Sequence, residues 1–292
     1  MGPSLVRVMS RHAVLLLSCR DRPGIVAAVA GFVTDVGGNI VEAEQHTDPQ
    51  DGMFFQRVQF TVDHLQVDED GLLEAFTPVA DRFGMDVQLR FTDWRPRTAV
   101  LASKPPHCLA DVLARAYTGE LALDIGLVVS NHDDHAGLAD AFKVPFHFVP
   151  VVDGDRGAQE AEVDALLRAD GVELVVLARY MLILSPWFVD RWAGRIINIH
   201  HSFLPAFVGA SPYRQAHDRG VKIIGATAHY VTAGLDQGPI IEQDVTRVTH
   251  RDDVATLARR GRDLEVTVLG RALRAHLEHR ILVWGNRTVV FG

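Results

Sequence analysis

Residues 12–91 show hydrophobic patterns that switch between the period of a strand and the period of a helix. Short apolar runs bounded by glycine, asparagine or aspartate predict strands, and apolar residues three or four positions apart predict helices. The expected elements are a strand at 12–19, a helix at 25–36, strands at 39–45 and 54–62, a helix at 72–83 and a strand at 85–91. This βαββαβ order predicts a ferredoxin-like domain.

The pattern changes after residues 92–97, a short charged segment around Pro96 that is typical of a linker. From residue 98 onward, apolar strands alternate with helices, which predicts a Rossmann-like parallel sheet covered on both faces. Strands are expected at 98–103, 124–130, 145–151, 173–178 and 195–200, and helices at 108–117, 135–142, 158–170 and 186–192. The sequence therefore predicts an α/β protein of two domains, 12–91 and 98–292.

The last part of the chain carries three further patterns. An apolar run predicts a strand at 223–231, and a long helical stretch is expected at 251–280. The apolar stripe of that stretch includes Leu257, Leu264 and Val268. Two apolar runs separated by Gly285-Asn286 then predict a closing hairpin.

Composition narrows the class of protein. The chain of 292 residues is 48% hydrophobic, and its formal net charge of −8 does not favour a nucleic-acid partner. Two cysteines imply no disulfide framework. Residues 1–11 lack the apolar core of a secretory signal, and the apolar run after them is too short to span a membrane. We therefore expect a cytoplasmic protein with no membrane partner. No G-x-G-x-x-G motif follows the strand at 98–103, which argues against a dinucleotide cofactor.

The strand at 195–200 carries the strongest candidate chemistry. Asn198 and His200 are two residues apart, so they share one face of the strand, and Pro205 follows shortly after. The carboxyl end of a parallel strand is where open α/β sheets bind ligands. Asp236 lies in a glycine-flanked loop before another apolar run, and the strand at 223–231 could bring it back beside this pair.

An amide, an imidazole and a carboxylate together suit attack on a carbonyl. An asparagine can stabilise a developing oxyanion, and an aspartate can orient a water molecule and accept its proton. No serine lies in a G-x-S-x-G motif, so attack by water or an external amine is favoured over an acyl-enzyme. Taken singly, each of these three residues is more often a turn former.

Other polar groups have simpler interpretations. The segment 131–135 has the residue types of a metal site, but a polar loop explains it better, and no metal site is predicted. His229 lies within an apolar strand and is typical of a buried core histidine that could still approach the site.

Several long motifs carry a family resemblance. They are NIHHSFLPAF at 198–207, GATAHYV at 225–231 and LARYM at 177–181. With the domain at 12–91, which resembles an ACT domain, they make the chain similar to the formyltetrahydrofolate deformylase family from about residue 12 to residue 292. Simple formyltransferases resemble only the second domain.

The resemblance implies a hydrolase acting on a linear amide C–N bond, without a catalytic cofactor. Its substrate would be 10-formyltetrahydrofolate and its products formate and tetrahydrofolate, in support of one-carbon balance and purine synthesis. By position, Asn198, His200 and Asp236 are the implied catalytic residues. The implied folate-binding residues are Arg179, Tyr180, Met181, Leu182 and Leu235. The residues implied to contact and support the catalytic side chains are His201, Ser202 and His229.

The ACT-like domain suggests regulation and assembly. The resemblance implies that the domain either binds a small amino acid such as glycine or methionine or serves for assembly alone. Because ACT-like domains usually pair, we expect a homo-oligomer, either a dimer or a tetramer. The candidate effector residues are Asp21, Pro23, Gly24, Gly38 and Asn39.

Two rival functions stay open on the residues alone. One is formyl transfer from folate to an amine such as glycinamide ribonucleotide, and the other is an amino-acid sensor with an inactive second domain. A hydrolase should close the acceptor side around residues 203–212, and formate release without an added amine would separate it from a transferase.

Overall fold

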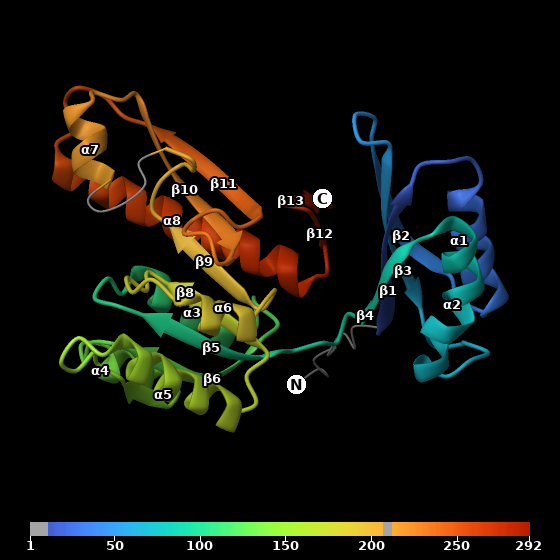
Figure 1. The fold of residues 1–292 in the computed structure, drawn as a ribbon, viewed down its shortest axis with the longest axis horizontal. Helices are drawn as coiled ribbons and strands as arrows, with labels where there is room; N and C mark the ends of the chain where they lie inside the picture. The colour runs from blue at the N-terminus through green and yellow to red at the C-terminus, as the bar shows by residue number, and fades with distance from the viewer. Residues whose placement is uncertain (1–10, 207–211) are drawn as a thin grey trace, which may run out of the picture. The chain divides into compact units, whose positions relative to one another are not determined.

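The computed structural model describes residues 11–206 and 212–292 (Figure 1). The chain divides into two compact units. Unit 1 contains the residues up to Trp94 together with Glu278–Leu282 and Val289–Gly292, whereas unit 2 contains Arg95–Leu277 and Val283–Thr288. The expected second domain covered all of 98–292, so the last residues of the chain are grouped differently in the structure.

Unit 1 has the predicted βαββαβ order. Its elements are β1 (His12–Arg20), α1 (Ile25–Asp35), β2 (Ile40–Asp48), β3 (Met53–Thr61), α2 (Glu69–Phe83) and β4 (Asp86–Phe91). The sheet has the order β2-β3-β1-β4, and its paired strands run antiparallel. Both helices cover one face, where Leu15, Leu17 and Phe60 meet Val29 and Phe76. The ferredoxin-like prediction is confirmed.

The C-terminal residues belong to unit 1 because they satisfy a buried arginine of its sheet. Arg57 on β3 is only 3% exposed. Its Nε donates to the carbonyl oxygen of His279 at 3.1 Å, and its Nη2 donates to that of Glu278 at 3.2 Å. The His279 ring is buried as well, with its Nε2 3.1 Å from the Phe91 carbonyl oxygen. Burial lowers the pKa of His279 to about 4.

Unit 2 follows the predicted alternation of strands and helices. It begins with β5 (Arg97–Ala102), α3 (His107–Tyr117), β6 (Asp124–Ser130), α4 (Ala136–Ala141), β7 (Phe146–Phe148), α5 (Arg156–Ala169), β8 (Leu174–Ala178), α6 (Pro186–Arg191) and β9 (Ile196–His200). It continues with α7 (Pro212–Asp218), β10 (Ile223–Tyr230), β11 (Ile240–Arg247) and α8 (Val254–Leu277). The hairpin of β12 (Ile281–Trp284) and β13 (Arg287–Val290) ends the chain where it was expected.

The large sheet has the order β11-β10-β9-β8-β5-β6-β7. Its pairs from β7 to β9 are parallel, as predicted, whereas β10 runs antiparallel to β9 and β11 runs antiparallel to β10. An antiparallel neighbour needs no crossover over a face of the sheet, whereas the parallel strands do. The mostly parallel α/β fold is thus confirmed, with two added antiparallel strands.

Helices cover both faces of this sheet (Figure 1). Helices α5 and α6 pack on one face, where Val163, Phe188 and Trp192 meet Leu101 and Leu177. Helices α3 and α8 pack together, and α8 contacts β9, β10 and β11. The chain therefore passes from β5 into α3 on one face of the sheet, and from the neighbouring strand β8 into α6 on the other face. Such a switch point, at the carboxyl ends of two adjacent strands, is where open α/β sheets form a ligand crevice.

Helix α8 differs from its prediction in length and in the face that it buries. It spans Val254–Leu277 rather than 251–280. Leu264 is only partly buried, whereas its neighbour Glu265 is fully buried. Across the described residues, no helix combines the length and apolar character needed to cross a membrane.

Candidate active site

Strands β9 and β10 place the predicted polar residues opposite one another. In their antiparallel pairing, Asn198 faces His229 and His200 faces Thr227. Ile197 and Ile199 are buried and anchor β9. Because directly paired residues in a sheet lie on the same face, this register brings the Asn198 amide beside the His229 imidazole.

The loop after β10 returns Asp236 to the same place. Asp236 Oδ2 lies 3.3 Å from His200 Nδ1, and Asp236 Oδ1 lies 3.8 Å from His229 Nε2. Asp236 adopts a left-handed backbone with φ of 54°. Gly238 allows this tight return, because a Cβ atom there would lie 1.7 Å from the Tyr230 carbonyl oxygen. The structure therefore brings the three predicted catalytic residues together.

Asp236 is held as a carboxylate. Burial by itself would raise the pKa of Asp236, but the hydrogen bond with His200 and its charge outweigh burial and lower that pKa below its usual value. The opposite ring nitrogen, His200 Nε2, is buried and has no hydrogen-bond partner among the described residues. His200 thus joins the carboxylate on one side and keeps an unused polar atom on the other.

His229 orients the amide of Asn198. Its Nδ1 lies 2.9 Å from the Tyr230 carbonyl oxygen, which can only accept, so Nδ1 carries the hydrogen. Its Nε2, 3.2 Å from Asn198 Nδ2, then accepts a hydrogen bond from the amide. Burial lowers the pKa of His229, which favours this neutral form. One hydrogen of the Asn198 amide stays available for a ligand.

A cavity of about 330 Å³ opens at these groups. It is lined by the five predicted folate-binding residues, Arg179, Tyr180, Met181, Leu182 and Leu235, and by all three predicted catalytic residues. Met181 and Leu235 are about half exposed and offer apolar surface to a ligand in the cavity. Tyr180 is mostly buried, and its hydroxyl accepts a hydrogen bond from Gln159 Nε2 at 2.8 Å.

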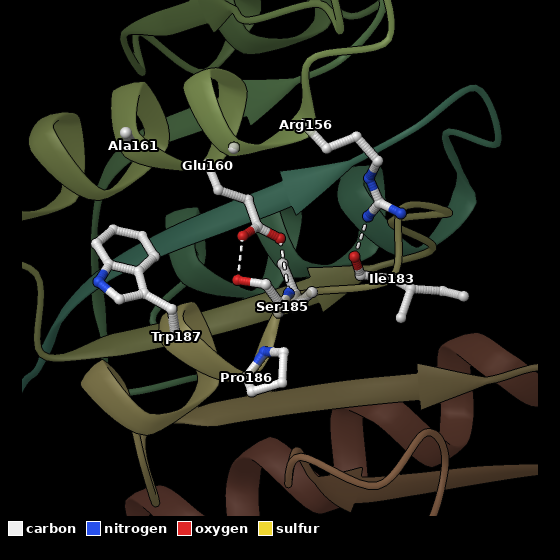
Figure 2. A pocket seen from close by; sticks show the side chains of 9 residues that line it. Arg156, Glu160, Ala161, Ile183, Ser185, Pro186 and Trp187 are labelled. Atoms are coloured by element: carbon white, nitrogen blue, oxygen red, sulfur yellow. Dashed lines mark hydrogen bonds between the residues drawn. The ribbon is translucent and has the colours of Figure 1, made fainter.

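A second hollow of about 620 Å³ adjoins the cavity and shares Ile183 and Leu184 with it. Figure 2 shows Arg156 and Glu160 reaching from α5 toward the segment that carries Ile183 and Ser185. Arg156 donates to the Ile183 carbonyl oxygen, and Glu160 accepts from the Ser185 backbone at 2.7 Å. The sequence predictions did not include this hollow. Its signal was Asp155, which caps α5 and fixes Arg156 in the first turn.

The predicted supporting residues have different surroundings. His201 is buried, and its ring lies 5.2 Å from that of His200 and 6.2 Å from that of Tyr213. Burial, followed by the charges of Arg179 and His200, lowers the pKa of His201 to about 3, so its ring is neutral at ordinary pH. Ser202 lies outside the cavity lining and donates to the Ala206 carbonyl oxygen at 2.7 Å, which holds the turn after β9.

A buried group of charged side chains lies next to His201, and the sequence analysis missed most of it. We call it the Glu265 cluster, consisting of Glu265, Arg179, His107 and Tyr213. Glu265 is 0% exposed, and its Oε2 lies 2.7 Å from His107 Nε2 and 3.3 Å from Arg179 Nε. Its Oε1 accepts from the Tyr213 hydroxyl. Burial would raise the pKa of Glu265, but the His107 hydrogen bond and the Arg179 charge outweigh it and lower that pKa.

This cluster has partial metal-ligand character. His107, Cys108 and Glu265 offer atoms within 4.8 Å of one another. Burial raises the pKa of the Cys108 thiol well above its usual value, and Arg179 already shares Oε2 of Glu265 with His107. An ion-paired network explains these contacts better than a cation. In the segment 131–135, Asn131 and His135 both bond to Ser103 and fasten the end of β5.

The predicted effector residues lie in unit 1 around the start and end of α1. Asp21, Pro23 and Gly24 are exposed, and Gly24 begins the helix with φ of 95°. Asn39 is exposed as well, and its backbone nitrogen donates to Thr61 Oγ1 at 3.1 Å. Gly38 lies against Phe60 and Val33, where a Cβ atom would crowd both. Binding of an effector here stays a prediction.

Comparison with known proteins defines the class and then the family. The formyl transferase family model matches residues 96–273, and the ACT domain model matches residues 13–80, so both predicted domain types are confirmed. A formyltetrahydrofolate deformylase from Synechocystis is 53% identical over 96% of this chain and 98% of its own length. The chain belongs to the formyltetrahydrofolate deformylase family.

Solved structures support the same assignment. A formyltetrahydrofolate deformylase from Pseudomonas syringae is 49% identical, with a TM-score of 0.94 over 99% of this chain and 97% of that one. A glycinamide ribonucleotide transformylase from Symbiobacterium toebii is 36% identical, with a TM-score of 0.64, and covers 68% of this chain and 95% of its own. The similarity to deformylases therefore includes both domain types, whereas the transformylase spans about the length of unit 2.

Proposed function

We propose that this protein hydrolyses 10-formyltetrahydrofolate to formate and tetrahydrofolate. The observation that carries the proposal is the grouping of Asn198, His200 and Asp236 in the lining of a largely apolar cavity. The near full-length similarity to proteins named formyltetrahydrofolate deformylase supports the same reaction.

The cavity suits the two ends of a folate. The pterin ring would lie against Met181, Leu182 and Leu235, because flat aromatic rings bind well to half-exposed apolar side chains. The anionic glutamate tail would extend into the adjoining hollow, where Arg156 can meet a carboxylate. This placement leaves the formyl group at Asn198, His200 and Asp236.

The reaction would proceed by direct attack of water. Asp236 accepts a proton from the water molecule, and the oxygen of that water forms a bond to the formyl carbon. The free amide hydrogen of Asn198 and a hydrogen on His200 Nε2 stabilise the negative charge on the formyl oxygen. The C–N10 bond then breaks and N10 takes a proton from His200. Asp236 passes the proton from water back to His200, and the formic acid leaves and ionises to formate. This route uses protein side chains and water alone.

Unit 1 would regulate this reaction. We propose that a small amino acid binds near Asp21, Pro23 and Gly24 at the start of α1 and near Gly38 and Asn39 after it, and that ACT domains of two or more copies pair. ACT domains commonly bind amino acids, and the family match supports this role. Titration with glycine and methionine, followed by formate release and by sedimentation, tests both parts.

A turnover assay tests the proposed function. Purified protein should release formate from 10-formyltetrahydrofolate without any added amine, and Asp236→Asn should remove most of that activity. Strict dependence on an amine such as glycinamide ribonucleotide would show a transferase instead. Folate binding without turnover would favour a sensor.

A further inference from the structure

The switch-point crevice of unit 2 is occupied by the protein's own side chains. Strands β5 and β8 are neighbours, and the chain leaves them toward different helical layers (Figure 1). Arg179 directly follows β8, and His107 starts the helix that follows β5. Both side chains meet Glu265, which comes from α8. A place where such folds bind a ligand is here filled by a charge cluster.

The cluster is almost completely buried. Glu265 has no exposed surface, and His107 and Arg179 side chains are 15% and 13% exposed. The Tyr213 hydroxyl reaches Glu265 only because residue 261 is glycine, since a Cβ atom there would lie 2.0 Å from that hydroxyl. Breaking a buried ion pair is costly, because it leaves an unpaired charge without water.

Arg179 joins the cluster to the catalytic cavity. It lines that cavity, and its backbone has φ of 63°, a conformation that a side-chain-bearing residue rarely adopts. Its Nε lies 3.3 Å from Glu265 Oε2 as an ion pair, and its buried Nε and Nη1 make no hydrogen bond among the described residues. His201, kept neutral, lies between the cluster and His200. Arg179 thus belongs both to the cavity lining and to the cluster.

We propose that the Glu265 cluster closes the acceptor side of the catalytic site, so that water reaches the formyl carbon and an amine substrate does not. This inference rests on the proposed function and concerns what attacks the formyl group. The folate side of the cavity, around Met181 and Leu235, is open and apolar. Elsewhere the cavity is lined by Arg179 and His201, which adjoin the buried Glu265 cluster.

The competing reaction has a defined balance. An amine nitrogen would form a bond to the formyl carbon, the C–N10 bond would break, and N10 would take the proton that the amine loses. The products are an N-formyl amine and tetrahydrofolate, in place of formate and tetrahydrofolate. The ratio of the two formyl products therefore reports which nucleophile reaches the carbon, whatever the total rate.

The test is the double variant Arg179→Gly/Glu265→Gln. Glycine suits the left-handed backbone at 179, and glutamine avoids leaving a buried carboxylate unpaired. Arg168→Ala is the matched control, because Arg168 is a half-exposed arginine whose partner Asp164 also pairs with Arg191. Each protein is incubated with 10-formyltetrahydrofolate and hydroxylamine, methylamine or glycinamide, and both formyl products are measured.

Wild type and Arg168→Ala should yield formate alone above the enzyme-free background. The double variant should raise the N-formyl to formate ratio by at least about tenfold, with the smallest amine gaining most. An unchanged ratio in a double variant that still turns over overturns the inference.

Wild type gives an independent check should the double variant fail to fold. If wild type already formylates glycinamide as readily as hydroxylamine, its acceptor side is open and the inference is wrong. Formate as the only formyl product above background supports it. If wild type releases no formate at all, the proposed function fails, which is a separate result.

Discussion

Two carboxylates of unit 2, Asp236 and Glu265, differ in what surrounds them. Asp236 and Glu265 each pair with a histidine, and in both the pKa is lowered although burial opposes this. Asp236 lies on a loop at the edge of a cavity, and its partner His200 has an unused ring nitrogen. Glu265 lies within α8, where His107, Arg179 and Tyr213 bind its two oxygens.

The difference separates a carboxylate that can take part in the reaction from one that holds the structure. A carboxylate whose histidine partner has one ring nitrogen without a hydrogen bond can exchange hydrogen bonds with a substrate. Its charge is therefore available during a reaction. A carboxylate with both oxygens bonded and no exposed surface has nothing to exchange, and its removal leaves buried charges unpaired. Substitutions at Asp236 should therefore change rates, and substitutions at Glu265 should change stability and access.

Asp236→Asn should have the largest effect on turnover. Asparagine tolerates the left-handed backbone at this position, but it cannot accept the proton of the attacking water. We expect formate release to fall by about 10³-fold or more, within the usual range for loss of a general base. The melting temperature should stay close to that of wild type. Asp244→Asn, at an exposed pair with Arg271, is the control.

Glu265→Ala should mainly lower stability, whereas Asp236→Asn mainly lowers turnover. It leaves Arg179 without its buried partner, and we expect the free energy of unfolding to fall by about 3–5 kcal/mol. Urea unfolding followed by tryptophan fluorescence measures this, with Asp263→Ala, an exposed change on the same helix, for comparison. Equal losses of unfolding free energy in Glu265→Ala and Asp263→Ala would contradict the structural role assigned to Glu265.

Asn198→Ala tests the side of the site that faces the formyl oxygen. The variant removes the amide that His229 orients, and loss of an oxyanion donor costs roughly 10²- to 10³-fold in rate. Substrate affinity should change little, because the lost interaction forms in the transition state. Single-turnover kinetics separate the two quantities. A loss confined to substrate affinity would place Asn198 in folate binding alone.

As the pH falls, the free energy of unfolding should begin to drop on account of His201, the histidine between the two carboxylates, before it drops on account of either carboxylate. The unfolded chain protonates His201 near pH 6.5, about the usual histidine value, whereas the folded protein does so only near its pKa of about 3. The unfolded state thus binds more protons across this window. The free energy of unfolding should fall by about 1.4 kcal/mol for each pH unit below 6.5 on account of His201.

His201→Asn tests this dependence on pH. The variant should unfold with a shallower pH slope than wild type over the same window, smaller by about one proton. Identical slopes in the two proteins would show that other groups cause the acid sensitivity.

Much of the fold follows from local patterns in the sequence. The strand that carries Asn198 and His200 was predictable, because alternating isoleucines mark its buried face and a polar turn follows it. That Asp236 would return beside His200 was a hypothesis, and the antiparallel register of β9 and β10 supplies the contact. The direction of β10 depends on the 201–222 connection, whose residues 207–211 lie outside the described part of the chain.

The Glu265 cluster was harder to predict because its members lie far apart in the sequence. Glu265 looks like a solvent-exposed helix residue until its partners are known. A signal was present in α8, where Gly261, Glu265 and Val268 follow helical spacing and are all buried. Only the tertiary fold brings His107 and Arg179 to that face, since no local rule connects a helix start, a strand end and a distant helix.

The return of the chain to unit 1 has a consequence for synthesis on the ribosome. Arg57 is made early, yet the carbonyl groups that receive its hydrogen bonds belong to Glu278 and His279. Until those residues emerge, one face of the first sheet lacks its final cover, although all four strands and both helices have been translated. Unit 1 therefore starts to form first and is completed last, so a nascent chain that stalls within α8 leaves it unfinished.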